Sequence, residues 1–114
     1  MPFIDVKTSV PMEEAQKESI KSRLGEAIRL IPGKSESWLM VGLEDNYRLY
    51  FKGNQDAPTA FVQVEVYGGE NGSAFAQLTG EITNILHTEL AIPADRIYVA
   101  YQTTKHWGWN GGNF

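Results

Sequence analysis

Pro2 could be chemically reactive because of its position near the amino terminus. It follows Met1, which is normally removed when so small a residue comes second, and removal leaves a free prolyl secondary amine. An α-amino group ordinarily has a pKa of about 7.7 to 8.0, and burial or a neighbouring cation lowers that value. A neutral amine can take a proton next to a carbonyl and return it elsewhere, or form an iminium adduct. Proline is also common at position 2 with no role beyond Met removal, so position alone indicates little.

Other patterns that could carry chemistry are weaker. The chain has no cysteine, which excludes thiol nucleophiles, thiolate metal sites and disulfides. The glycine-rich segment 68–72 lacks the spacing of either nucleotide-binding fingerprint and is interpreted as a turn. His87 and His106 are far apart and no further ligands accompany them, so we expect no metal site. The net charge of -4 argues against a nucleic-acid partner, because phosphate binding needs clustered Lys and Arg.

Hydrophobic periodicity shows which elements must position Pro2. Alternation over residues 2–7 predicts a half-buried strand, and an apolar stripe at helical spacing predicts a helix from about Pro11 to Leu30. Residues 38–43 are apolar on both faces, which favours a central strand. The pair Asp45-Asn46 then predicts a hairpin turn into a strand over 47–51.

The same order of elements begins again at Pro58. A strand over 58–67, a helix over about 73–90 and a strand over 96–101 are predicted. The chain is therefore a single α/β domain, residues 1–114, whose halves at about 2–57 and 58–114 are β-α-β units sharing one mixed sheet. Because such crossovers are nearly always right-handed, both helices should cover the same face of that sheet.

The other face of the sheet would then lie bare. Strand parity places five large apolar or aromatic side chains on it: Phe3, Trp38, Met40, Tyr67 and Tyr98. Exposed patches of this kind usually mark interfaces, so we expect a closed homo-oligomer with its sheets facing inward. The polar residues among them, Asp5, Gln63 and Glu65, indicate a partly wet interior.

Taken in order, these features resemble the macrophage migration inhibitory factor family of the tautomerase superfamily. The residues that carry the resemblance are Pro2, Pro11, Gly33-Lys34, Asp95-Arg96-Ile97-Tyr98 and the ending Gly108 to Phe114. The resemblance covers essentially the whole chain. It implies a homotrimer, because superfamily members with two β-α-β units assemble in threes.

The resemblance also implies a function, a cofactor-free keto-enol tautomerase acting on small enol and keto acids such as phenylpyruvate. Pro2 matches the catalytic base, Lys34 the lysine that binds the substrate carboxylate, and Tyr98 a tyrosine that enters the site from the neighbouring subunit. The pocket walls match Tyr67, Trp38, Trp107, Trp109 and Phe114. Without the resemblance, Lys34 would be a solvated lysine at a helix end and the aromatic residues ordinary core or interface.

Several positions depart from the family pattern. Ala100 stands where many members have an asparagine that hydrogen-bonds the substrate, which puts substrate preference in question. Residues 58–62 replace the two-cysteine motif of mammalian members, so thiol oxidoreductase activity cannot transfer. Residues 52–54 and Ser35 also differ, which indicates an altered loop near the pocket. The aromatic tail should be docked, because three large rings in eight residues favour burial.

Two other functions remain open. The family includes secreted cytokines, so the chain could instead bind a host receptor, with vestigial tautomerase activity; it could also be a structural trimer of unknown role. The first residues contain no apolar run suited to a signal peptide, and no later run could span a bilayer. We therefore expect a cytoplasmic protein, or one secreted without a signal peptide.

Overall fold

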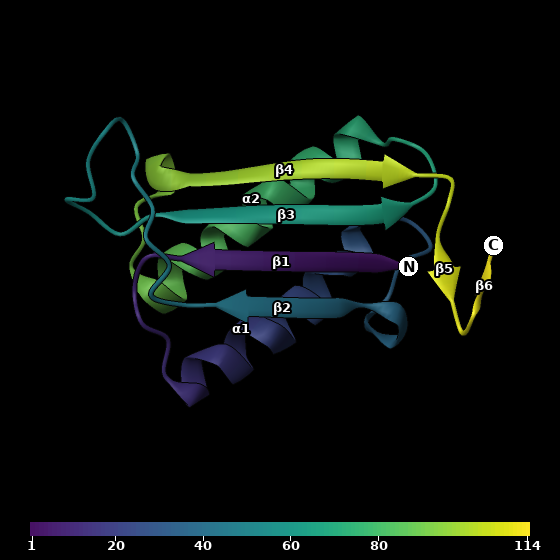
Figure 1. Ribbon diagram of the computed structural model, residues 1–114, viewed down its shortest axis with the longest axis horizontal. Coiled ribbons are helices and arrows are strands. Elements are labelled where there is room, and N and C mark those ends of the chain that lie inside the picture. The colour runs from purple at the N-terminus through teal and green to yellow at the C-terminus, as the bar shows by residue number, and fades with distance from the viewer.

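The structure is a computed structural model that describes all of residues 1–114. Its centre is a four-stranded sheet with the order β2-β1-β3-β4. The strands are β1 (Pro2–Thr8), β2 (Met40–Glu44), β3 (Ala60–Tyr67) and β4 (Ile97–Thr104). Two helices, α1 (Glu14–Ala27) and α2 (Gly72–Leu90), lie behind this sheet in Figure 1. A short hairpin of β5 (Gly108–Trp109) and β6 (Gly112–Asn113) ends the chain.

The strand pairing confirms two β-α-β units. β1 pairs with β2 in parallel and β3 with β4 in parallel, while β1 and β3 join the halves as an antiparallel pair. Both helices cover one face, as the right-handed crossover rule requires. The α/β fold expected from the sequence is therefore confirmed.

The core lies between the helices and the covered sheet face. Alternate residues of β1 and β3 are buried, since successive side chains of a strand point to opposite faces. The largest fully buried side chains are Ile4, Ile20, Leu24, Ile28, Leu78, Ile82, Ile85, Leu86, Ile92, Val6, Val62 and Val64. This rigid base fixes where β1 begins, and so where Pro2 lies.

The first helix begins later than the sequence predicted. Glu13 is its N-cap, and a capping box joins the Glu13 and Gln16 side chains to each other's backbone amides. Pro11 therefore lies before the helix, because the capping box satisfies the first free amides without it. The α-helix ends at Ala27, and one 3₁₀ turn, Ile28–Leu30, continues it.

The segment after α1 also differs from the prediction. Trp38 lies in a 3₁₀ turn, Glu36–Trp38, and β2 begins only at Met40. β2 is an edge strand of this chain, not a central one. Placing Trp38 on the bare face by strand parity was therefore wrong, because parity holds only inside a strand.

No strand forms over 47–51, and Asp45-Asn46 does not turn a hairpin. The backbone of residues 48–50 makes no hydrogen bond to other backbone groups of the chain. The tight turn lies further on, where Phe51 and Asn54 exchange backbone hydrogen bonds of 2.8 and 3.1 Å. Lys52 and Gly53 between them have φ angles of 53° and 80°, as a two-residue type I′ turn requires.

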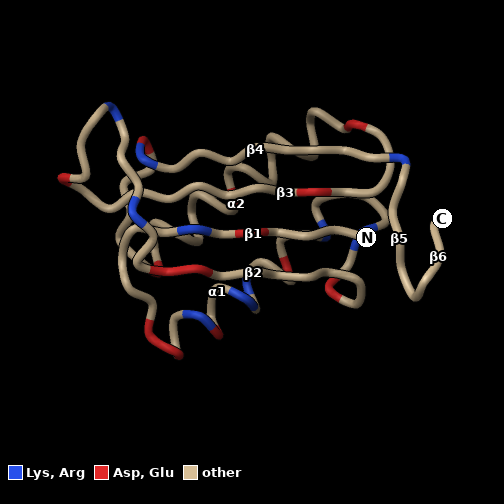
Figure 2. The backbone as a smooth tube through the Cα atoms, viewed as in Figure 1, with Lys and Arg blue, Asp and Glu red and all other residues tan.

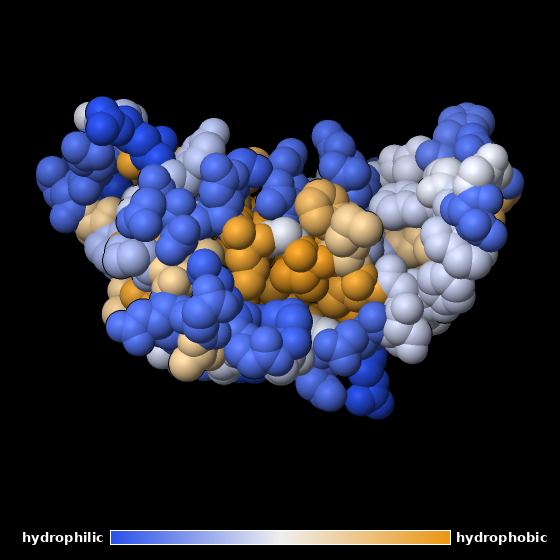
Figure 3. All heavy atoms as spheres, turned by 60° about the horizontal axis from the view of Figure 1, so that its bottom comes forward, coloured by the Kyte–Doolittle hydropathy of each residue, from blue (hydrophilic) through white to orange (hydrophobic).

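The uncovered sheet face has a raised flank at each end. Figure 3, viewed from the β2 side, shows the two ends of the molecule rising on either side of an apolar middle at the β2 edge. In Figure 1 the loop that follows β2 lies at one end of the sheet and the β5–β6 hairpin at the other.

Charged residues of both signs are scattered along the chain, with Asp5 and Lys7 side by side on β1 (Figure 2). Neither helix is long and apolar enough to cross a membrane.

Candidate functional site

Pro2 lies in a cavity at the end of the sheet where β1 begins. The residue is buried, and the cavity has a volume of about 360 Å³. Its lining comes from the chain start, the 3₁₀ turn before β2 and the tail: Met1, Pro2, Phe3, Ser37, Trp38, Leu39, Met40, Trp107, Gly108 and Trp109. The structure thus gathers Pro2, Trp38, Trp107 and Trp109 around one space.

Lys34 provides a positive charge beside the chain start. A Pro32-Gly33 turn places it there, with the Lys34 amide donating to the Ile31 carbonyl at 3.1 Å and Gly33 at a φ of 82°. The Lys34 ammonium donates to the Tyr67 carbonyl at 2.9 Å and lies 6.0 Å from the centre of the Tyr67 ring. Burial, and then the Lys34 cation, lower the pKa of the Met1 α-amino group from its ordinary value.

Aromatic edges hold the tail over this end of the sheet. Trp38 and Trp109 meet edge to face at 5.2 Å, and Tyr67 and Phe114 do the same at 5.4 Å. The Phe114 amide also donates to the Trp107 carbonyl at 3.1 Å. The tail is docked, yet Trp109 and Phe114 remain about half exposed, at 52% and 53%.

Tyr98 does not lie near Pro2 in the same chain. Pro2 pairs with Val66 and Tyr98 pairs with Phe61, five residues apart along β3. At about 3.3 Å per residue this puts the two ends roughly 17 Å apart along the sheet. Figure 1 shows the same separation, with β1 and β4 starting at opposite ends. Tyr98 is 59% exposed on the bare face, so only another copy of the chain could bring it to a Pro2 cavity.

With this geometry in view, comparison with known proteins identifies the family. A family model described as macrophage migration inhibitory factor (MIF) matches residues 1–114. The chain belongs to the MIF family. A Xenopus laevis macrophage migration inhibitory factor is 24% identical over 118 residues, covering 100% of this chain and 99% of that protein.

Solved structures of MIF-family proteins share the fold. MIF2 of Leishmania major matches with a TM-score of 0.92 at 37% identity, covering 100% of this chain and 97% of the other. The homologue from Prochlorococcus marinus matches with a TM-score of 0.81 at 31% identity over 98% of each chain. A further structure, Pt0534 inactivated by 2-oxo-3-pentynoate, has a TM-score of 0.82 at 16% identity, covering 96% of this chain and 93% of the other, and shares the fold.

Sequence reasoning about this MIF-family chain missed part of the Pro2 cavity. Ser37 and Leu39 line it because the 3₁₀ turn before β2 directs them there. Phe3 and Met40, placed only at an interface by parity, line it as well. Strand parity was the signal that could have identified these two, since they are register partners at the start of β1.

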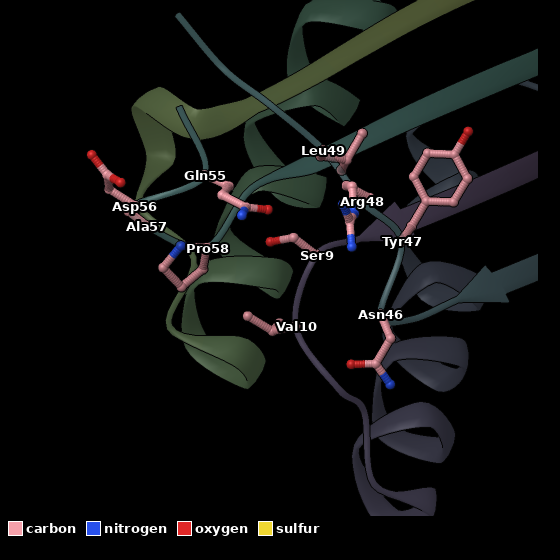
Figure 4. Close-up of a pocket in the computed structure, with 10 residues that line it drawn as sticks. All are labelled: Ser9, Val10, Asn46, Tyr47, Arg48, Leu49, Gln55, Asp56, Ala57 and Pro58. Carbon is pink, nitrogen blue, oxygen red and sulfur yellow. The ribbon is translucent and has the colours of Figure 1, made fainter. Parts of the chain in front are cut away.

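A second cavity, of about 390 Å³, lies at the opposite end of the sheet and contains none of the expected site residues. It is shown in Figure 4, where Arg48 and Gln55 extend toward the space in front of Ser9 and Tyr47 points away. Two residues of the unpaired segment 48–50, Arg48 and Leu49, line it. This cavity therefore belongs to the loop that also lies near Tyr98, not to the Pro2 site.

Proposed function

We propose that this chain, once Met1 is removed, is a cofactor-free keto-enol tautomerase of phenylpyruvate-like acids with Pro2 as general base. The observation that carries the proposal is the burial of Pro2 at a cavity lined by three tryptophans and Phe3. Lys34 does not line this cavity, but its cation lies close enough to lower the pKa of the Met1 amine next to it. Membership of the MIF family supports it. An aryl pyruvate has an apolar ring for the tryptophan walls and a carboxylate for Lys34.

The state of the amine decides whether the chemistry can run. With Met1 attached, the Pro2 nitrogen is a tertiary amide and has no useful basicity. After removal, the secondary amine lies in the surroundings that lower the pKa of the Met1 amine, namely burial first and Lys34 second. A lowered pKa leaves more of the amine neutral at pH 7, and the neutral form is the base.

The reaction balances without a cofactor. The Pro2 nitrogen takes a proton from the carbon next to the substrate carbonyl, and the electron pair of that C–H bond moves to give an enolate. The protonated amine then returns the proton to the enolate oxygen, so substrate and product are isomers and the base is restored. Lys34 binds the carboxylate throughout, and its charge, which lowers the pKa of the Met1 amine, would likewise disfavour protonation of the freed Pro2 amine.

We also propose that the working form is a homotrimer in which Tyr98 completes the neighbour's Pro2 site. Three features support assembly: the bare sheet face, the two unpaired sheet edges and the unpaired backbone of residues 48–50. The number three comes from the family resemblance. Tyr98 lies on the bare face at the end far from Pro2, as a residue contributed to a neighbour must.

The test replaces Pro2 and follows enol formation from phenylpyruvate. Pro2→Gly keeps a free amine but loses the secondary amine in its pocket, and we expect turnover to fall at least about 100-fold while the oligomer persists. Pro11→Gly is the matched control, because Pro11 is exposed and lies outside the helix. Intact-mass measurement must first show that Met1 is absent.

A covalent probe gives an independent readout. The reagent 2-oxo-3-pentynoate, which inactivated Pt0534, is an electrophilic keto acid. Addition of the Pro2 nitrogen to its triple bond would attach the whole reagent to the first peptide of the processed chain, with the amine proton moving to the adjacent alkyne carbon. A chain with one extra residue before Pro2 should be neither labelled nor active. Unchanged turnover in Pro2→Gly would contradict the proposed function.

A further inference from the structure

Arg96 lies where the 3₁₀ turn Ala94–Arg96 leads into β4, two residues before Tyr98. Its guanidinium makes three hydrogen bonds, all to uncharged acceptors. Nε donates to the Thr59 hydroxyl at 2.8 Å, and the two Nη groups donate to the side-chain and main-chain oxygens of Asn54 at 3.2 and 3.3 Å. An arginine with several fixed acceptors is held in one conformation, since its planar donors fit only one arrangement.

The two partners of Arg96 differ in how firmly they are anchored. Thr59 is buried and exchanges bonds with Ser9 at the end of β1, at 2.9 Å in each direction. Asn54 closes the Lys52-Gly53 turn of an exposed loop by pairing with Phe51. Arg96 therefore ties a loop that has few contacts of its own to the rigid end of the sheet.

Phe51 lies between Arg96 and Tyr98 and contacts both. The Arg96 guanidinium lies 5.3 Å from the centre of the Phe51 ring, and the Phe51 and Tyr98 rings meet edge to face at 5.4 Å and 82°. A small cavity of about 80 Å³ adjoins Phe51, Arg96 and Tyr98. Without Arg96 the Phe51 ring has space to turn away, and Tyr98 would lose the ring that fixes its orientation.

We propose that Arg96 is a positioning residue which, acting through Phe51, fixes the Tyr98 ring for the Pro2 site of the neighbouring copy. This inference rests on the proposed function, because it takes Tyr98 to be that neighbour's contribution. A half-exposed tyrosine otherwise samples several rotamers, and ordering it at each turnover would slow the reaction. Displacements of about 1 Å in a supporting residue can cost as much as 100-fold in rate.

The test is a double-mutant cycle on kcat/KM for the processed protein with phenylpyruvate. Arg96→Met keeps the length of the side chain but loses all three hydrogen bonds, and we expect kcat/KM to fall about tenfold, in kcat more than in KM. In a Tyr98→Ala background the same change should cost less than about twofold. Phe51→Leu, which leaves the Arg96 bonds intact, should show the same dependence on Tyr98.

Arg29→Met is the matched control, because Arg29 is exposed on the helix side and pairs only with Glu26. Sedimentation of each variant checks that the oligomer is unchanged. If Arg96→Met fails to assemble, Phe51→Leu takes its place in the double-mutant cycle with Tyr98→Ala. Equal losses with and without Tyr98 would show a merely structural role and overturn the inference, as would wild-type kinetics in both variants. An inert Tyr98→Ala would also overturn it, while Pro2→Gly separately decides whether Pro2 is the base.

Discussion

Different kinds of interaction hold together the two ends of the sheet. At the Pro2 end, four aromatic rings form two edge-to-face pairs, and the Lys34 ammonium donates a hydrogen bond to the Tyr67 carbonyl beside them. At the Tyr98 end, hydrogen bonds from one arginine to Asn54 and Thr59 organise a loop around a single edge-to-face ring pair. The first end forms a cavity around Pro2, the proposed base, and the second presents the exposed Tyr98 ring against Phe51.

Under the proposed function, each end is half of a site. The Pro2 cavity has aromatic walls, with Lys34 beside the chain start, but it is open, with Trp109 and Met40 exposed by 52% and 68%. At the other end, the Tyr98 ring contacts Phe51 and is 59% exposed. A closed cyclic oligomer brings one kind of end to the other in every interface, because each copy makes the same contact in turn.

The largest expected effect comes from separating the two ends onto different chains. Pro2→Gly and Tyr98→Ala homomers should both have low activity, the first at least about 100-fold below the unmodified protein. After unfolding and refolding together in equal amounts, about a quarter of the sites should combine an intact Pro2 with an intact Tyr98 of the neighbour. We therefore expect activity to recover toward about a quarter of the unmodified value.

Initial rates before and after mixing measure this recovery. Mixing without unfolding is the control, since stable oligomers exchange subunits slowly. If the refolded mixture shows only the average of the two separate activities, then Tyr98 and Pro2 do not share a site across chains. The two ends would then differ in structure but would not form a shared active site.

A smaller effect is expected from Lys34→Ala, which alters only the Pro2 end. Loss of the ammonium removes the partner of the substrate carboxylate, so KM should rise about tenfold while kcat changes less. The Lys34 cation also lowers the pKa of the Met1 amine, second to burial, and we expect it to act in the same direction on the Pro2 amine once Met1 is removed. Activity needs the neutral amine, so it rises as pH increases through that pKa.

Removing Lys34 therefore raises the pKa and moves the acid limb of the kcat/KM profile to higher pH. Lys105→Ala is the matched control, because Lys105 is exposed and, unlike Lys34, is not among the groups that lower the pKa of the Met1 amine. A Lys34→Ala profile that coincides with the unmodified one would show that burial alone sets the pKa. A KM that does not change would remove Lys34 from the binding site.

Part of the Pro2 end could be predicted from the sequence, because its strands β1 and β3 follow a simple periodicity, whereas the 3₁₀ turn that holds Trp38 was missed. Alternation along residues 2–7 and 58–67 gave strands close to the observed β1 and β3, and helical spacing gave α2 within one residue. Burial of one face drives both patterns, so the pattern and the structure share a cause. Pro2 as the candidate base came from its position after Met1, and Lys34 from the family resemblance.

The Tyr98 end could not be predicted in the same way. The stretch over 47–51 contains strand-forming residues, but a strand needs a partner, and within one chain residues 48–50 have none. The hydrogen bond from Arg96 to Asn54 joins residues 42 positions apart, so no local sequence pattern predicts it. The one available signal was Lys52-Gly53, since glycine often supplies the positive φ of a tight turn.

The smallest expected effects come from a matched pair of glycines, one supporting each end. Gly33 and Gly53 have φ angles of 82° and 80°, and a methyl group on either would meet no atom within 4 Å. Alanine at either position should therefore cost a similar amount of unfolding free energy, about 1 kcal/mol, from backbone strain alone. Thermal or urea unfolding measures this cost.

The kinetic effects of the two glycine variants should nevertheless differ. Gly33→Ala disturbs the turn that places Lys34, so it should raise KM by about twofold to threefold and leave kcat nearly unchanged. Gly53→Ala disturbs the turn between Phe51 and Asn54, so it should lower kcat by a similar factor and leave KM nearly unchanged. Because the strain is the same, a difference in kinetics can come only from what each turn supports. Identical kinetic changes in the two variants would mean that the ends do not have separate roles in binding and turnover.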